Sequence, residues 1–170
     1  MSELRHAPDR SARRAPVLGL PVLVVLGLVA IALPRVVVHD LGLVPPQGVA
    51  AALLAIVPPL VWIGVAVVWS TRPFRSLLAA GAGYGIGLAA IHNLMWGVVF
   101  AGDAPRLGGN LAEVPQGIAE VGMRIAASFS SLLVGLAVGA LAGLVAWAVR
   151  AVVSRAGVSR LPLAAGSARS

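Results

Sequence analysis

The sequence predicts an all-α membrane protein with four transmembrane helices. Hydrophobic residues make up 59% of the 170 residues, and charged residues only 11%. A soluble domain carries about 45–50% apolar and about 25% charged residues, so too few polar side chains remain here to cover a globule. The chain also contains four stretches without Asp, Glu, Lys or Arg that are long enough to cross the ~30 Å hydrocarbon core as helices.

The predicted transmembrane domain covers 17–149, with spans at about 17–34, 49–70, 77–101 and 125–149. Barrel strands alternate apolar and polar residues over about 10 positions, whereas these runs are continuous and longer, so helices are expected. A basic N-terminal segment (1–16) precedes the spans, and a basic tail (150–170) follows them. The stretch 116–124 follows Pro115, and we expect it to extend the fourth helix or to lie in the interface.

The second span carries Pro58 and Pro59 at its centre. Each proline lacks an N–H and clashes with the carbonyl four residues earlier, which predicts a kink over 54–59. Transporters use broken helices to build ion sites, but membrane helices also carry prolines without such a role. We favour a structural kink.

The third and fourth spans carry matching rows of small residues. Small residues let two membrane helices approach closely, so the rows predict that these spans pack against each other as an antiparallel pair. A glycine-lined pore is the alternative reading. The row members at four-residue intervals are Gly81, Gly85, Ala89, Asn93 and Gly97 in one span, and Ala127, Ser131, Gly135, Gly139 and Gly143 in the other; Gly83 and Gly87 form a further row.

His92 and Asn93 are the polar exceptions in the third span. By helical rise, Ser128 and Ser131 lie at a comparable depth in the fourth span, which predicts a polar cluster of these four residues. Successive helical residues point about 100° apart, so Asn93 is expected to face the fourth span and His92 to point elsewhere. We expect the cluster to form hydrogen bonds between helices. The alternative is a ligand or proton site.

Arginine placement predicts the orientation. Ten of the 13 arginines fall on the side of the two termini and of the connection at 71–76, and three fall on the other side with four acids. The positive-inside rule therefore predicts that both termini are cytoplasmic. The absence of Lys and the abundance of Ala, Val, Leu and Gly are typical of a GC-rich bacterial genome, which indicates a bacterial inner membrane. In an alternative reading, residues 1–32 form a signal peptide that ends at Ala30-Ile31-Ala32 and leaves three spans.

Several chemistries are not expected. The chain has no Cys, which excludes disulfides, thiolate metal sites and thiol catalysis. No predicted span contains a carboxylate, which disfavours proton- or sodium-coupled transport, and only one span histidine is present for a haem. HExxH, GxSxG and phosphate-loop motifs are absent as well. We therefore expect no metal, no cofactor and no enzyme activity.

The sequence favours a structural or accessory membrane component that binds membrane lipid, a membrane-protein partner or further copies of itself, and no nucleic acid. An oligomeric transporter or channel for small molecules or ions is the alternative, with the Pro58-Pro59 break and the His92/Asn93 cluster as its site. A membrane enzyme that admits a head group to His92 is the third hypothesis.

Overall fold

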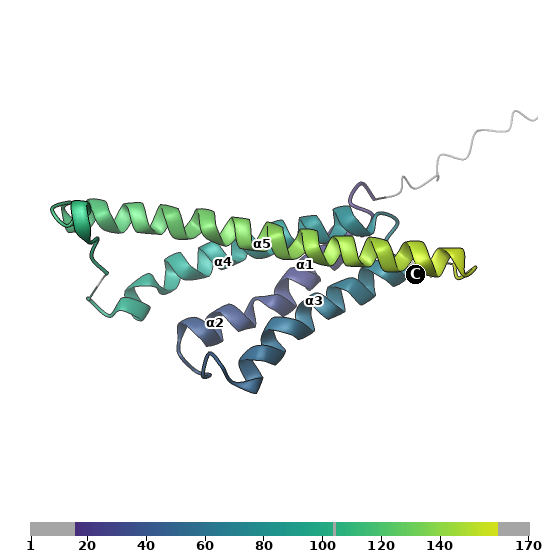
Figure 1. The fold of residues 1–170 in the computed structure, drawn as a ribbon, viewed down its shortest axis with the longest axis horizontal. Coiled ribbons are helices and arrows are strands. Elements are labelled where there is room, and N and C mark those ends of the chain that lie inside the picture. The colour runs from purple at the N-terminus through teal and green to yellow at the C-terminus, as the bar shows by residue number, and fades with distance from the viewer. Residues whose placement is uncertain (1–15, 104, 160–170) are drawn as a thin grey trace, which may run out of the picture.

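A computed structural model describes residues 16–103 and 105–159, and within them the regular structure is entirely helical (Figure 1). Four helical stretches are long and apolar enough to cross a membrane, which confirms the predicted fold class. The helices are α1 (Val22–Ala32), α2 (Pro34–Asp40), α3 (Val49–Trp69), α4 (Pro73–Phe100) and α5 (Gln116–Arg155), with a short 3₁₀ turn η1 (Gly109–Leu111) between the last two.

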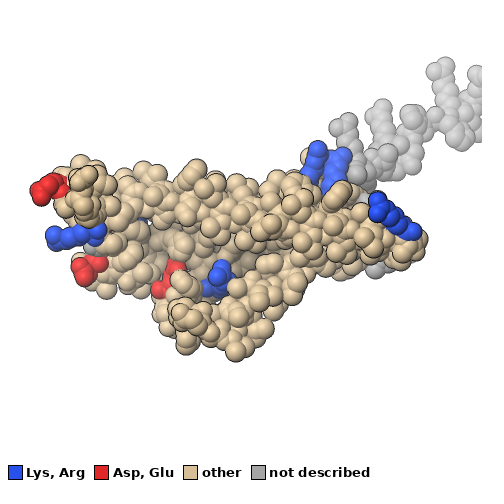
Figure 2. Space-filling model, in the orientation of Figure 1, with Lys and Arg blue, Asp and Glu red and all other residues tan. Residues whose placement is uncertain are grey.

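The helices are gathered at one end and splayed at the other. Figure 1 shows α4 and α5 side by side along most of their length, whereas α2 and the start of α3 diverge from α5, with α2 still in contact with α4. We call the gathered end, which holds Arg72, Arg75, Arg150 and Arg155, the arginine end. The end that holds the connections 41–48 and 101–115 is called the loop end. Figure 2 shows only basic side chains at the first and both signs of charge at the second.

The small-residue rows form the contact between α4 and α5. A Cβ added to Gly81 would lie 2.6 Å from the Cα of Gly139, and one added to Gly85 would lie 2.9 Å from the Cα of Leu132. Real Cβ atoms essentially never approach other heavy atoms this closely, so the backbones touch only because side chains are missing. Gly135, Gly139 and Gly143 line the other side of this contact, against α4 backbone and Phe74.

The second glycine row has a different partner from the first. A Cβ on Gly83 would lie 2.9 Å from a methyl of Val29, and one on Gly87 would lie 2.7 Å from a methyl of Leu33. This row therefore faces the first span rather than widening the α4–α5 contact. Gly97, at the loop end of the first row, has nothing within 4 Å of an added Cβ.

The first span differs most from its prediction. The helix begins at Val22, breaks at Leu33 and continues as α2 to Asp40 instead of ending at Pro34. Proline suits the first turn of a helix, where its missing N–H is not needed, so Pro34 starts a new helix here. The membrane-long stretch Val22–Asp40 therefore takes in Arg35 and Asp40, two charged residues that lie beyond the predicted first span.

The other three spans lie closer to their predicted bounds than the first span does. α3 continues as one helix through Pro58 and Pro59, and the helical run of the first span is the one that is interrupted, at Leu33; the kink over 54–59 stays a prediction. α4 starts at Pro73, a few residues before the predicted 77, again with proline in the first turn. α5 takes in 116–124 and reaches 40 residues. At 1.5 Å per residue it is about 60 Å long, twice the hydrocarbon thickness.

The core lies where α1, α3 and α4 meet. Trp62 is fully buried, its Nε1 donates to the Leu28 carbonyl oxygen at 2.7 Å, and its ring lies edge-on to Tyr84. Trp62 is thus a packing residue of this core. Helix α1 also contributes Val25 and Leu28 to this core, so cleavage after Ala32 would remove part of it.

The arginine end is closed by side-chain bonds to the start of the chain. Ser76 Oγ donates to the Leu18 carbonyl oxygen at 2.6 Å, and Arg72 Nη1 donates to the Val17 carbonyl oxygen at 3.2 Å. These bonds hold the beginning of the first span against the turn between α3 and α4. Most of the predicted basic N-terminal segment and half of the basic tail, namely 1–15 and 160–170, lie outside the described residues.

Candidate functional site

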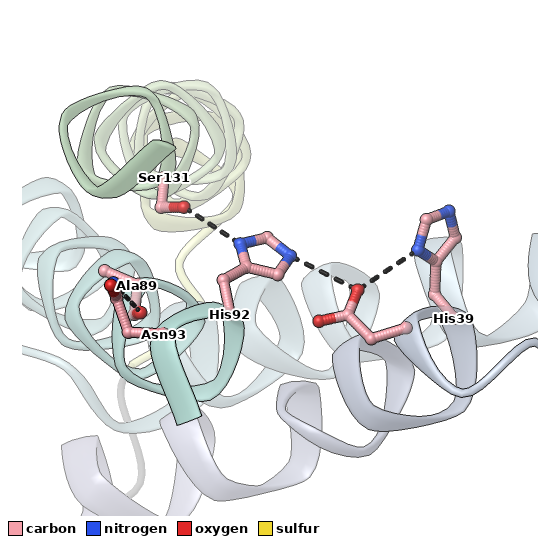
Figure 3. Close-up of polar contacts among 6 residues, drawn as sticks. His39, Ala89, His92, Asn93 and Ser131 are labelled. Carbon is pink, nitrogen blue, oxygen red and sulfur yellow. Dashed lines mark hydrogen bonds and ion pairs between the residues drawn. The ribbon is translucent and has the colours of Figure 1, made fainter. Parts of the chain in front are cut away.

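His92 of α4 is held by both ring nitrogens. Its Nδ1 lies 3.2 Å from Ser131 Oγ of α5, and its Nε2 lies 3.3 Å from Asp40 Oδ1 of α2 (Figure 3). A neutral imidazole donates from one nitrogen and accepts at the other, and a protonated one donates from both. In either state His92 can bond to both partners, and it links α2 to the α4–α5 pair.

Asp40 lies between two histidines. Its Oδ1 is also 3.4 Å from Nδ1 of His39, so one carboxylate oxygen faces both imidazoles. The Asp40 side chain is 8% exposed and His39 is 64% exposed. Within the part of the chain that the structure describes, the buried Oδ2 of Asp40 has no hydrogen-bond partner. A buried carboxylate is costly unless it is paired, so the two imidazoles are its counter-groups.

Sequence reasoning missed Asp40 and His39 because it ended the first helix at Pro34. One signal for their placement was available. The apolar residues Val36, Val37 and Val38 prolong the hydrophobic run past Pro34, and Arg35 and His39 are four residues apart, on one face of a helix. What could not be read from the chain is that α2 leans far enough over α4 for Asp40 to meet His92.

Asn93 and Ser128 form a second polar link, between α4 and α5. Asn93 Nδ2 donates at 2.8 Å to Ser128 Oγ and at 2.8 Å to the Ala89 carbonyl oxygen, while Ser128 Oγ donates to the Arg124 carbonyl oxygen. Asn93 thus faces α5, and His92 faces both α5 and α2. The four residues of the predicted cluster form two separate pairs, His92–Ser131 and Asn93–Ser128.

Arg124 closes the α4–α5 interface at the loop end. Its Nη2 lies 2.8 Å from Glu120 Oε1, its Nη1 donates to the Asn93 carbonyl oxygen at 3.1 Å, and its guanidinium lies 4.8 Å from the centre of the Trp96 ring. The charge of Arg124 is therefore balanced by Glu120, and each of its three side-chain nitrogens donates one hydrogen bond. A groove of about 350 Å³ beside it is also lined by Asp103 and Arg106, so it carries both signs of charge.

Arg35 is placed differently. It lines three neighbouring cavities, of about 260, 180 and 70 Å³, in the hollow between α2, α3 and α5. Figure 2 shows one basic and one acidic patch in this hollow. We call it the Arg35 groove. Arg35 is exposed, and among the described residues no side chain or carbonyl forms a hydrogen bond or ion pair with it.

The groove combines polar groups with apolar walls. His39 lines the 260 Å³ cavity, and Asp40 and His92 line the 180 Å³ cavity together with Arg35. Leu54 and Ala55 line the 260 and 70 Å³ cavities. These two residues precede Pro58 and Pro59 by four positions, and a proline has no N–H to donate to their carbonyl oxygens. The groove therefore offers a cation beside apolar walls at membrane depth.

Ser131, His92 and Asp40 follow one another in the order of a hydrolytic triad, but nothing around Ser131 suits that chemistry. Ser131 is 4% exposed and lines none of the three cavities around Arg35. It lies inside a continuous helix, where backbone N–H groups bond along the helix and leave no oxyanion donors. No group of three or more possible metal ligands occurs in the described residues either.

Comparison of the chain with known protein families, curated proteins and solved structures finds no match.

Proposed function

We propose that the protein is an accessory component of a bacterial inner membrane that binds a membrane lipid or a membrane-protein partner, without enzyme activity. The observation that carries this proposal is the Arg35 groove, in which an unpaired guanidinium lies among apolar walls within a transmembrane stretch. Charged side chains in spans usually face a partner, so one without a partner among the described residues indicates that the partner is another molecule.

The lipid-facing surface supports the same proposal. Outside the α4–α5 contact the helices bury little of their length, and large apolar side chains such as Leu53, Leu60, Leu133 and Leu141 are more than half exposed. These apolar faces suit contact with membrane lipid, and the proposal also includes a membrane-protein partner or further copies of the chain. Nucleic acid is not proposed as a partner, because the arginines are explained by membrane topology.

For the orientation, we propose that the arginine end is cytoplasmic. The described arginines Arg72, Arg75, Arg150 and Arg155 lie at that end with no acid beside them, and Asp103, Glu113 and Glu120 lie at the loop end. Both termini are then cytoplasmic and the Arg35 groove opens within the outer leaflet. Reporter fusions to the last residue and to the connection 102–115 test this orientation, and an external C-terminus contradicts it.

Co-purification tests the binding role. The full chain, extracted in a mild detergent, is expected to carry lipid or protein at fixed stoichiometry, measured by native mass spectrometry and proteomics. The matched control is a second four-span protein of the same host, purified in the same way. A monomer that carries no lipid and no protein beyond that control contradicts the proposal.

A second candidate, transport of a proton-linked solute, gains support from Asp40. The sequence argument against coupled transport was the lack of a carboxylate in any span, and Asp40 lies buried against His92 at the end of the first span. Chains of Asp and His inside a bundle are typical of proton relays. Flux in proteoliposomes that depends on a proton gradient and is abolished by Asp40→Asn favours transport. Flux that Asp40→Asn and His92→Gln leave unchanged removes it.

A further inference from the structure

We propose that the Arg35 groove binds an anionic phospholipid of the surrounding leaflet, with the lipid phosphate on the Arg35 guanidinium and an acyl chain along the seam between α3 and α5. This inference rests on the proposed binding function and names the ligand. It is argued from three features of the groove, namely the free charge, the depth of its parts and its open side.

The charge identifies the head group. A guanidinium keeps its proton at any physiological pH, so Arg35 cannot lose its charge to fit an apolar site. Helix α3 carries no charged residue, and the single carboxylate in the groove, Asp40, is bonded to His39 and His92 rather than to Arg35. The fork of N–H donors matches a phosphate in two parallel bonds, which makes a phosphate ester the natural counter-ion.

The depths of the cavities indicate how the ligand is oriented across the leaflet. Arg35 stands five residues before Asp40, where the first span ends, which is about 7.5 Å along a helix axis. The cavity of about 70 Å³ lies further in, against Pro58, Trp62 and Val138, and Pro58 is at the middle of α3. A lipid in its leaflet has the same arrangement, with an anionic head group near the membrane surface and apolar chains beneath it. A free anion would leave the deeper, apolar cavity unfilled.

The groove is open on the side of α5. Val134 lines both the 70 and the 180 Å³ cavities and is still 46% exposed, so the seam between α3 and α5 can admit an acyl chain sideways from the bilayer. The lateral opening toward the bilayer favours a lipid of the leaflet as the occupant.

Lipid retention tests the ligand. Native mass spectrometry is run on the full chain in mild detergent with phosphatidylglycerol, with phosphatidylcholine or with inorganic phosphate alone. We expect the wild type to prefer phosphatidylglycerol, and Arg35→Gln to bind it roughly tenfold more weakly, since a charge-assisted hydrogen bond of this kind corresponds to about that factor. Arg75→Gln removes an arginine at the other end of the molecule and is expected to keep the preference.

A second variant controls for an effect of the Arg35→Gln substitution on folding. Val134→Phe fills the open seam, leaves Arg35 in place and is expected to weaken binding of both lipids. Unchanged lipid preference in Arg35→Gln overturns the inference, as does an equal loss in Arg75→Gln or saturation by inorganic phosphate alone. If the wild type retains both lipids equally, the ligand assignment is wrong but the binding role stands. Absence of any bound lipid or protein refutes the binding role itself.

Discussion

Adding one methyl group at Gly135 tests the claim that α4 and α5 are held together by backbone contact. A Cβ at this position would lie 2.5 Å from both the Cα and the N of Gly85. Ordinary contact begins at 3.4 Å, so the two helices must separate locally by about 0.9 Å to accept alanine. The obstructing atoms belong to the backbone, which cannot swing aside as a flexible side chain can.

The expected cost follows from overpacking. Inserting a methyl into a close-packed contact costs about 1–3 kcal/mol, and we place Gly135→Ala in that range. Alanine also stabilises a helix relative to glycine by up to about 1 kcal/mol, which partly hides the cost. Gly97→Ala is the matched control, because Gly97 belongs to the row of α4 and an added Cβ there meets nothing within 4 Å. The propensity gain is common to both variants, so their difference isolates the clash.

The measurement is the free energy of unfolding in mixed micelles, followed by helicity as sodium dodecyl sulfate replaces the mild detergent. Gly135→Ala should unfold at a lower dodecyl sulfate fraction than Gly97→Ala, with a difference of about 1–3 kcal/mol. If the two variants unfold together, the α4–α5 contact is looser than described and the reasoning fails.

Two further predictions concern polar contacts. In a double-mutant cycle with Asn93→Ala and Ser128→Ala, the free energies of unfolding should give a coupling energy near 0.6 kcal/mol, the usual value for a hydrogen bond between membrane helices. A coupling energy of zero would show that the bond is absent in the bilayer. Trp62→Phe, which removes the donor to the Leu28 carbonyl oxygen, should lower the free energy of unfolding by about 0.5–1.5 kcal/mol beyond the change in packing; a neutral effect contradicts the buried bond.

Asn93 and the glycine rows were predictable because their information is local. Helical periodicity decides which residues share a face, and close packing in lipid needs small residues on that face. Row members Gly81, Gly85, Gly135 and Gly139 therefore meet as the pattern indicates. The same periodicity correctly placed Asn93 against α5 and pointed His92 toward the first span, but the expectation that His92 does not face the fourth span was wrong, because its other ring nitrogen bonds to Ser131 of α5.

Asp40, His39 and Arg35 were not predictable in the same way. A proline that follows an apolar run is compatible both with the end of a helix and with the first turn of a new helix. The second interpretation adds the whole helix α2, which the first one omits. The contact of Asp40 with His92 joins residues 52 positions apart, so it depends on the lean of α2 over α4 and not on any local pattern.

By itself the chain determined that four helices cross a membrane, that two of them pack through glycine, and which end carries the arginines, because apolar length, side-chain size and charge act residue by residue. Only the tertiary structure decided that the helices splay apart at the loop end and that Arg35, His39, Asp40 and His92 surround one groove. The physical reason is that a groove is the space left between neighbouring helices, and the shape of this space depends on the arrangement of all of them.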